Sequence, residues 1–293
     1  MKHHFGKMLS VLLAVTALCI CFPVQAMADI GPKPSVRVEF NCDWEGDFYV
    51  TLLSHQKSTG PYSYEFTEDI PPEYMLKGDD AAQVAEAWAA MKNYVDSDGF
   101  CFIGFMEKCS RESGFSWTYY PPNSFKVLVY HPADKSFTVS DIYGKYAFDS
   151  YYELSMVQGS AILQKSYDFT WEILSLIARI AMTIILEVLL TFAFGIKDKK
   201  MLGIIVCGNI ITQLALNIFL NIINYQNGSL AFTFYYILAE IGIIIAESVI
   251  YTTAQKKYRC DVAKGRLIGY AAVSNTVSFA AGLYIAHLIP GIF

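Results

Sequence analysis

The chain has 293 residues, of which 54% are hydrophobic and 17% are charged, and its formal net charge is −5. This composition is too apolar for an ordinary soluble protein and indicates a soluble domain joined to membrane-spanning helices. The charge is unevenly spread, because residues 29–168 contain 21 acidic but only 11 basic side chains. Nucleic-acid phosphates require clusters of Lys and Arg, so this acidic part predicts no nucleic-acid partner.

The first 28 residues, Met1 to Ala28, predict a secretory signal peptide. Lys2 and Lys7 provide a basic start, residues 8–22 form an apolar run, and Ala26-Met27-Ala28 provides a cleavage site of mostly small residues. An uncleaved membrane helix is the alternative, but the apolar run is short for a complete span. We therefore expect the residues that follow to be exported.

Residues 29–165 predict an extracytoplasmic β-rich domain that resembles a β-sandwich and carries one helix. The helix is expected over residues 80–95, where apolar residues recur at helical spacing behind Asp79 or Asp80 as the N-cap. Turn-forming pairs such as Pro121-Pro122 separate the expected strands. Seven segments have the alternating or β-branched character of strands: Val36–Phe40, Phe48–Leu53, Phe102–Met106, Phe115–Tyr120, Phe125–Tyr130, Phe137–Ser140 and Ala147–Leu154.

The exported part contains no motif that establishes a catalytic, metal or cofactor site. Asp96-Ser97-Asp98-Gly99 resembles a fragment of a calcium loop but lacks the remaining ligands, so we interpret it as the turn that ends the helix. Three cysteines, Cys42, Cys101 and Cys109, are an odd number, and the sequence leaves their pairing open. We therefore predict no cofactor and no enzymatic activity.

Four apolar segments predict a membrane α-helical bundle, because each exceeds the roughly 20 residues that cross a bilayer core. The loops 196–200 and 255–266 are rich in Lys and Arg, whereas the loop 225–230 has no charge. The positive-inside rule then places both basic loops in the cytoplasm and the soluble domain outside the plasma membrane. The predicted transmembrane segments are Phe169–Phe194, Leu202–Asn224, Ala231–Ala254 and Leu267–Ile289.

Ionisable and amide side chains inside these segments form the candidate site. An ionisable group in hydrocarbon costs about 2.5–3.5 kcal/mol on insertion scales, so each requires a partner or a role. Counting depth at ~1.5 Å per residue predicts two polar layers in the bundle. The layer nearer the outside is expected to contain Arg179, Gln213, Glu240 and Ser278, and the deeper layer Glu187, Asn209, Glu247 and Asn275.

The two layers suggest different chemistry. We expect Arg179 to neutralise Glu240 as an ion pair, and Glu187 and Glu247 to form a carboxylate pair. Two close carboxylates in a low dielectric cannot both remain ionised without a cation or a shared proton. This arrangement suits proton or cation coupling or the binding of a polar ligand. The alternative is that the polar side chains only join the helices by hydrogen bonds.

Three patches carry a resemblance: Asp29 to Ser35 (DIGPKPS), Tyr120 to Lys126, and Tyr146 to Tyr152. Together with the polar spans, they make the chain similar to bacterial envelope membrane proteins that pair an exported domain with four C-terminal helices. The resemblance covers nearly the whole chain after the predicted signal peptide. It implies this architecture and brings no catalytic residue with it.

The sequence therefore predicts an integral cell-envelope membrane protein that acts as a non-enzymatic sensor, scaffold or complex subunit. A small proton- or cation-coupled transporter that uses the buried polar residues is the alternative, and an intramembrane enzyme is a weaker one. The expected partners are the lipid bilayer and a membrane protein or a second copy of the chain.

Overall fold

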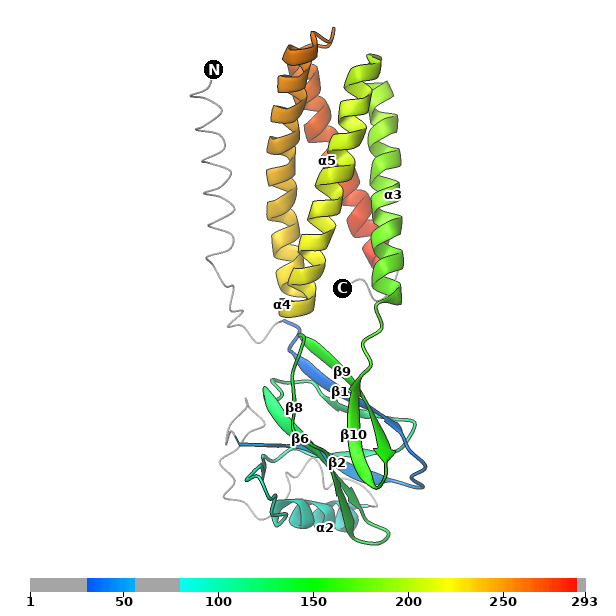
Figure 1. Ribbon diagram of the computed structural model, residues 1–293, viewed down its shortest axis with the longest axis vertical. Helices are drawn as coiled ribbons and strands as arrows, with labels where there is room; N and C mark the ends of the chain where they lie inside the picture. The colour runs from blue at the N-terminus through cyan, green and yellow to red at the C-terminus, as the bar shows by residue number, and fades with distance from the viewer. Residues whose placement is uncertain (1–30, 56–79, 289–293) are drawn as a thin grey trace. The chain divides into compact units, whose positions relative to one another are not determined.

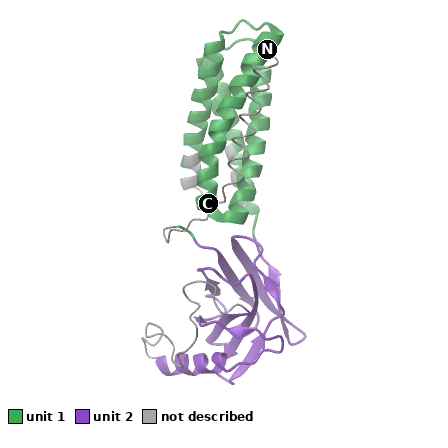
Figure 2. Cartoon of the chain, turned by 90° about the vertical axis from the view of Figure 1, so that its left-hand side faces the viewer, with its two compact units in different colours: residues 1–32, 168–293 green, residues 33–167 purple. Residues whose placement is uncertain are grey.

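The computed structural model describes residues 31–55 and 80–288, so the predicted signal peptide lies outside the described residues. The chain divides into two compact units, coloured separately in Figure 2. Residues 33–167 form one of them, here called the β unit, and the described residues from Asp168 onward form the helical unit. The prediction of an N-terminal β-rich region followed by long apolar helices is confirmed.

In residues 33–55 and 80–167, the described part of the β unit, there are two sheets and one helix, α2 (Ala81–Lys92). The first sheet has the strand order β10-β9-β1-β5, and within it β1 and β9 run parallel, with Val36 opposite Ser150. The second sheet has the order β3-β2-β6-β7, and β4 and β8 pair with β2 and β6. The strands are β1 (Ser35–Asn41), β2 (Phe48–Ser54), β3 (Cys101–Phe102), β4 (Glu107–Cys109), β5 (Phe115–Trp117), β6 (Ser124–His131), β7 (Ser136–Val139), β8 (Tyr143–Gly144), β9 (Asp149–Val157) and β10 (Ser160–Lys165).

The β unit is built in three layers, because the second sheet is covered on both faces. One face contributes Val50 and Val127 to a core shared with the first sheet. The other face contributes Leu128 to a core in which α2 buries Trp88 and Met91. Every residue of β2 is consequently buried, whereas β1 alternates between buried and exposed positions. This is the pattern expected for an inner and an outer sheet.

Several predicted boundaries were wrong. The predicted strand Phe102–Met106 is interrupted, because the chain turns at Gly104 with φ of 81° and strand pairing resumes only at Glu107. The helix ends at Lys92 instead of residue 95, and Val95 is 89% exposed. Strand β10 was not predicted, although Ala161 and Leu163 alternate with exposed residues in it.

The helical unit contains α3 (Thr170–Ala193), α4 (Lys199–Tyr258) and α5 (Lys264–Leu288). The 60 residues of α4 form two limbs, 199–227 and 229–258, because Gly228 has the non-helical angles φ 80° and ψ 178°. Thr212 donates a 2.8 Å hydrogen bond to Glu247, 35 residues away. An unbroken helix would separate these residues by about 52 Å, so the chain folds back at Gly228. Figure 1 shows the two limbs side by side.

The predicted uncharged loop 225–230 is thus a reversal centred on one residue. By length and composition, two described helices could cross a membrane: α3, through Leu176–Ala193, and α4. The sequence predicts four spans. Of these, α4 accounts for two, because it contains two helical limbs that meet at Gly228.

Replacing Gly228 by Ala is expected to destabilise the helical unit by about 1–3 kcal/mol, because the angles at this position are essentially restricted to glycine. The measurement is thermal unfolding of the purified protein in detergent. Gly242→Ala is the matched control, since its added Cβ meets no atom within 4 Å and it lies in regular helix. Equal melting temperatures for Gly228→Ala and the wild type would contradict the assignment of the reversal.

Candidate functional site: a buried polar cluster among the helices

The helical unit has the reverse of the polarity expected for a soluble bundle. Large aliphatic side chains face outward, among them Ile185 at 59% exposure and Ile211 at 67%. Among the described side chains of this unit, eleven polar ones are buried, and two of the three carboxylates in this set are fully enclosed. The buried polar residues are Thr183, Glu187, Thr191, Asn209, Gln213, Asn217, Glu240, Glu247, Ser274, Asn275 and Ser278.

Glu247, on the second limb of α4, is held by donors from two other helical segments. Its Oε1 accepts the Thr212 hydroxyl at 2.8 Å, from the first limb. Its Oε2 accepts the Asn275 amide Nδ2 at 2.6 Å, from α5. Hydrogen bonds of this length to both carboxylate oxygens stabilise the ionised form of the group.

Glu187, on α3, has a poorer set of partners. Its Oε1 lies 3.5 Å from Oγ of Ser278, and no partner among the described residues reaches its Oε2. The nearby hydroxyls of Thr191 and Tyr270 bond instead to the main-chain carbonyl of Glu187, at 2.8 and 3.0 Å. The carboxyl group is therefore enclosed without being satisfied.

The predicted site residues do not form two separate layers in the structure. Asn275 contacts Glu247 as its predicted level requires, but Ser278, predicted for the outer layer, lies beside Glu187. Asn209 is buried and accepts a hydrogen bond from the Tyr251 hydroxyl. Helix α5 thus joins the two carboxylates, with Asn275 and Ser278 one turn apart.

Few side-chain hydrogen bonds are present among the described residues predicted for the outer layer. Glu240 is 6% exposed, and its Oε2 has no partner among the described residues. Gln213 is buried, and its main-chain carbonyl accepts Nδ2 of Asn217 at 2.8 Å. The side chain of Arg179 lies outside the described residues, so the Arg179–Glu240 ion pair remains a prediction.

Sequence reasoning did not include two hydroxyl-bearing residues that belong to the cluster: Tyr251 and Tyr270. Each had a usable signal. Tyr251 lies four residues after Glu247, and Tyr270 lies four before the buried Ser274, so both share a helix face with a buried polar residue. This pattern is easily overlooked, because an aromatic Tyr in an apolar segment is usually interpreted as an ordinary core or interface residue.

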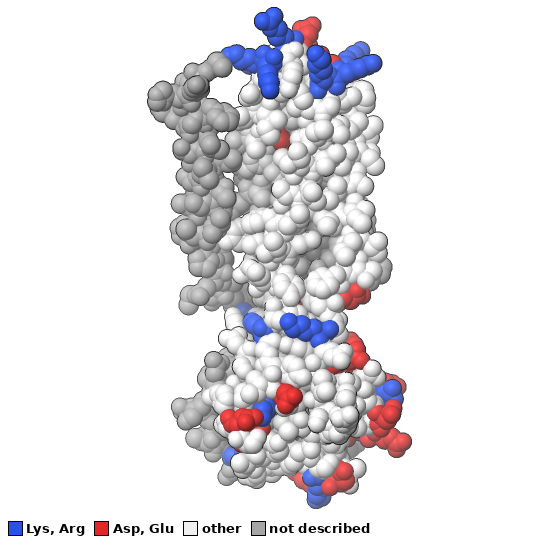
Figure 3. Space-filling view, in the orientation of Figure 1, with Lys and Arg blue, Asp and Glu red and all other residues white. Residues whose placement is uncertain are grey.

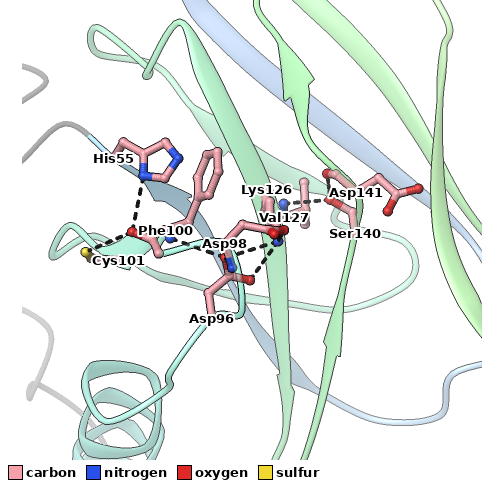
Figure 4. A network of polar contacts seen from close by, with 10 residues as sticks. His55, Asp96, Asp98, Phe100, Cys101, Lys126, Val127, Ser140 and Asp141 are labelled. Carbon is pink, nitrogen blue, oxygen red and sulfur yellow. Dashed lines mark hydrogen bonds and ion pairs between the residues drawn. The ribbon is translucent and has the colours of Figure 1, made fainter.

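The Asp96–Asp98 segment of the β unit is a structural ion-pair cluster, drawn in Figure 4. Lys126 Nζ lies 2.8 Å from Asp96 Oδ1 and 2.5 Å from Asp98 Oδ2. The main-chain N–H groups of Asp98 and Phe100 also donate to Asp96, at 3.0 and 3.2 Å. Burial opposes ionisation of Asp96, but the hydrogen bonds from Lys126, Phe100 and Asp98 keep its pKa below its usual range. The segment is a turn whose carboxylates already have a cation.

The other candidate ligands of the β unit are similarly structural. Cys42, Cys101 and Cys109 are free thiols. Burial is the main cause that raises the pKa of the Cys109 thiol, which makes it unreactive. Within residues 31–55 and 80–288, no group of three His, Cys, Asp or Glu side chains could hold a metal ion.

The described Lys and Arg side chains of the helical unit gather at one end. Figure 3 shows Lys and Arg there, and the face it displays is nearly free of charge along the rest of the helices. These basic residues lie around the connections α3–α4 and α4–α5. They are Lys197, Lys199, Lys200, Lys256, Lys257, Arg259, Lys264 and Arg266.

Comparison of the chain with protein-family models, curated proteins and solved structures found no match. The resemblance to bacterial envelope proteins with four C-terminal helices therefore remains a prediction.

Proposed function

We propose that this chain is an integral cell-envelope protein whose helical unit spans the plasma membrane and holds the β unit on the extracytoplasmic side. Its role is that of a non-enzymatic sensor, scaffold or subunit of a membrane complex. The observation that carries this proposal is the inverted polarity of the helices, with aliphatic side chains outside and carboxylates inside. In water, this arrangement would expose a large apolar surface, whereas lipid covers it without cost.

The dimensions support four membrane crossings. The 24 residues of α3 are about 36 Å long at ~1.5 Å per residue. Each limb of α4 has a similar or greater length, and α5 has 25 residues. A bilayer core is about 30 Å thick, so α3, both limbs of α4 and α5 are each long enough to cross it. The turn at Gly228 and the basic connections then lie at opposite membrane surfaces.

The orientation follows from the charge distribution. The connections α3–α4 and α4–α5 contain the basic residues, and the reversal at Gly228 has no charged neighbour within residues 225–230. Positively charged connections are retained in the cytoplasm during insertion. The segment that leads into α3 from the β unit therefore starts on the outer side.

The β unit is the part suited to recognition. It has two cores of its own, and its buried ion pair and the buried thiols of Cys42 and Cys109 belong to its interior. A separately folded exported domain held on a bundle is the arrangement expected of a receptor, scaffold or assembly partner. Lipid and a further membrane protein are the partners that this arrangement implies.

Labelling of single cysteines with a membrane-impermeant maleimide tests this proposal. Variants retain one cysteine each: the exposed Cys101 of the β unit, a Lys257→Cys reporter in the α4–α5 connection, or the outward-facing Cys207 of α4. In intact spheroplasts, we expect the reagent to label Cys101 only. Permeabilisation should make the residue-257 reporter accessible as well. Cys207 should remain unlabelled in both preparations. Labelling of the residue-257 reporter in intact spheroplasts would overturn the orientation. Efficient labelling of Cys207 by the aqueous reagent would overturn membrane insertion.

A further inference from the structure

The cluster around Glu247 contains more acceptors than donors. Asn275 uses its amide protons on Glu247 Oε2, at 2.6 Å, and on the main-chain carbonyl of Ala271, at 2.9 Å. Its own carbonyl oxygen Oδ1 is then enclosed without a partner among the described residues, as is Glu187 Oε2. Both side chains are fully buried. Two unpartnered acceptors near the Glu247 carboxyl group show that this interior is short of hydrogen-bond donors.

The contact between Ser278 and Glu187 shows where a proton fits. The Ser278 hydroxyl has one proton, and its nearest acceptor is the main-chain carbonyl of Ser274, at 2.9 Å. With that proton used, Ser278 Oγ presents a lone pair toward Glu187 Oε1, 3.5 Å away. A carboxylate at Glu187 would place two acceptors face to face, whereas a carboxylic acid would donate to Ser278. The geometry is thus complementary to the neutral acid.

The charged surroundings of Glu187 favour the same form. Glu240 and Glu247 act on it electrostatically from α4, together with the Tyr251 hydroxyl, and Tyr270 faces it from α5. Among the residues with described side chains, no Lys, Arg or His forms an ion pair with these carboxylates, and the side chain of Arg179 on α3 is not described. A second negative charge next to Glu247 in this interior would be unfavourable.

We propose that Glu187 and Glu247 form an asymmetric proton-binding site, in which Glu187 carries the proton and Glu247 is the fixed anion. Binding converts the Glu187 carboxylate and one proton into a carboxylic acid that donates to Ser278. Glu247 retains its two donors, Thr212 and Asn275, throughout. The assignment goes beyond the proposed function, because it depends only on the interior of the helical unit and not on its orientation.

Occupancy of this site controls how the helices pack. Glu187 lies on α3, Glu247 on α4, and Asn275 and Ser278 on α5, so one proton lies at the meeting point of three helices. Loss of the proton creates a second anion beside Glu247 and a repulsive contact between Glu187 and Ser278. The packing of α3 against α4 and α5 therefore depends on proton occupancy.

Infrared spectroscopy of the purified full-length protein in lipid at neutral pH tests the assignment. The wild type is expected to show the carbonyl stretching band of a buried protonated carboxyl, which disappears at alkaline pH. We expect Glu187→Gln to abolish that band component and Glu187→Asp to retain it at a shifted frequency. Glu247→Gln should keep it, and so should Glu240→Gln, the matched control from the same interior.

Three results would overturn the proposal: no protonated carboxyl in the wild type, an unchanged band in Glu187→Gln, or loss of the band in Glu247→Gln. If Glu187→Gln does not fold, the frequency shift expected for Glu187→Asp still tests the assignment, since an unshifted band would reject it. The cysteine labelling that tests membrane orientation reads a different property. Failure of either proposal is thus distinguishable from failure of the other.

Discussion

Replacement of Lys126 by Met is expected to destabilise the β unit by about 3 kcal/mol, at the lower end of the range for breaking a buried ion pair. The side chains of Lys126 and Asp96 are 6% and 2% exposed, so the substitution leaves Asp96 as a buried anion. Asp98 is 54% exposed, which keeps water near one side of the cluster and limits the loss. The N–H groups of Asp98 and Phe100 still solvate Asp96 in part.

Urea unfolding of the full-length protein in detergent, followed by tryptophan fluorescence, measures this effect, because three of the four tryptophans, Trp44, Trp88 and Trp117, lie in the β unit. The double variant Asp96→Asn/Lys126→Met should recover much of the loss, since it removes the unpaired charge as well. Lys108→Met is the matched control. Lys108 pairs with Asp47 and Asp80 but is 37% exposed, so little change is expected. Equal effects of the two Lys→Met substitutions would contradict a buried role for Lys126.

Lys126 also shows why part of the β unit could not be predicted. The β-branched and aromatic residues around it predict strand β6 correctly, but β6 belongs to the inner sheet and is buried on both faces. The partner that permits a buried lysine, Asp96, is 30 residues earlier in the chain. Only the tertiary fold brings the turn after α2 over this face of the sheet.

In the helical unit, too, local spacing in the sequence predicted part of the structure, and tertiary packing determined the rest. Helical spacing predicted which residues share a face, and all the predicted site residues with described side chains are buried. Spacing does not determine the vertical offset between helices. A count of depth treats each helix as straight and perpendicular to the membrane, and for this reason it placed Ser278 in the outer layer instead of beside Glu187.

The position of the reversal at Gly228 could be predicted from the sequence, but its short length could not. A loop over residues 225–230 is the natural interpretation of an uncharged polar stretch that contains Asn227, Gly228 and Ser229. The structure instead makes the reversal within one residue, because glycine reaches angles closed to other residues. The sequence therefore predicts that the chain turns here, while the compactness of the turn depends on how closely the two limbs pack.

Substitution of Ile211 by Arg is expected to reduce the amount of folded protein in the membrane, with a cost of about 2.5–3.5 kcal/mol for a charge in hydrocarbon. Ile211 lies near the middle of the first limb of α4 and is 67% exposed, so Arg meets no packed neighbour there. In an aqueous environment, the same exposed substitution would be neutral or would improve solubility. The sign of the effect therefore distinguishes lipid from water around this helix.

The experiment compares the membrane-fraction yield and the melting temperature of Ile211→Arg with those of Ala263→Arg. Ala263 is also exposed but lies in the basic α4–α5 connection, where an added positive charge agrees with the proposed cytoplasmic side. Ile211→Leu controls for loss of the native side chain without adding charge. Membrane insertion requires that Ile211→Arg alone lowers both quantities. If Ile211→Arg and Ala263→Arg behave alike, the outward aliphatic surface around Ile211 faces water, and membrane insertion of this helix is rejected.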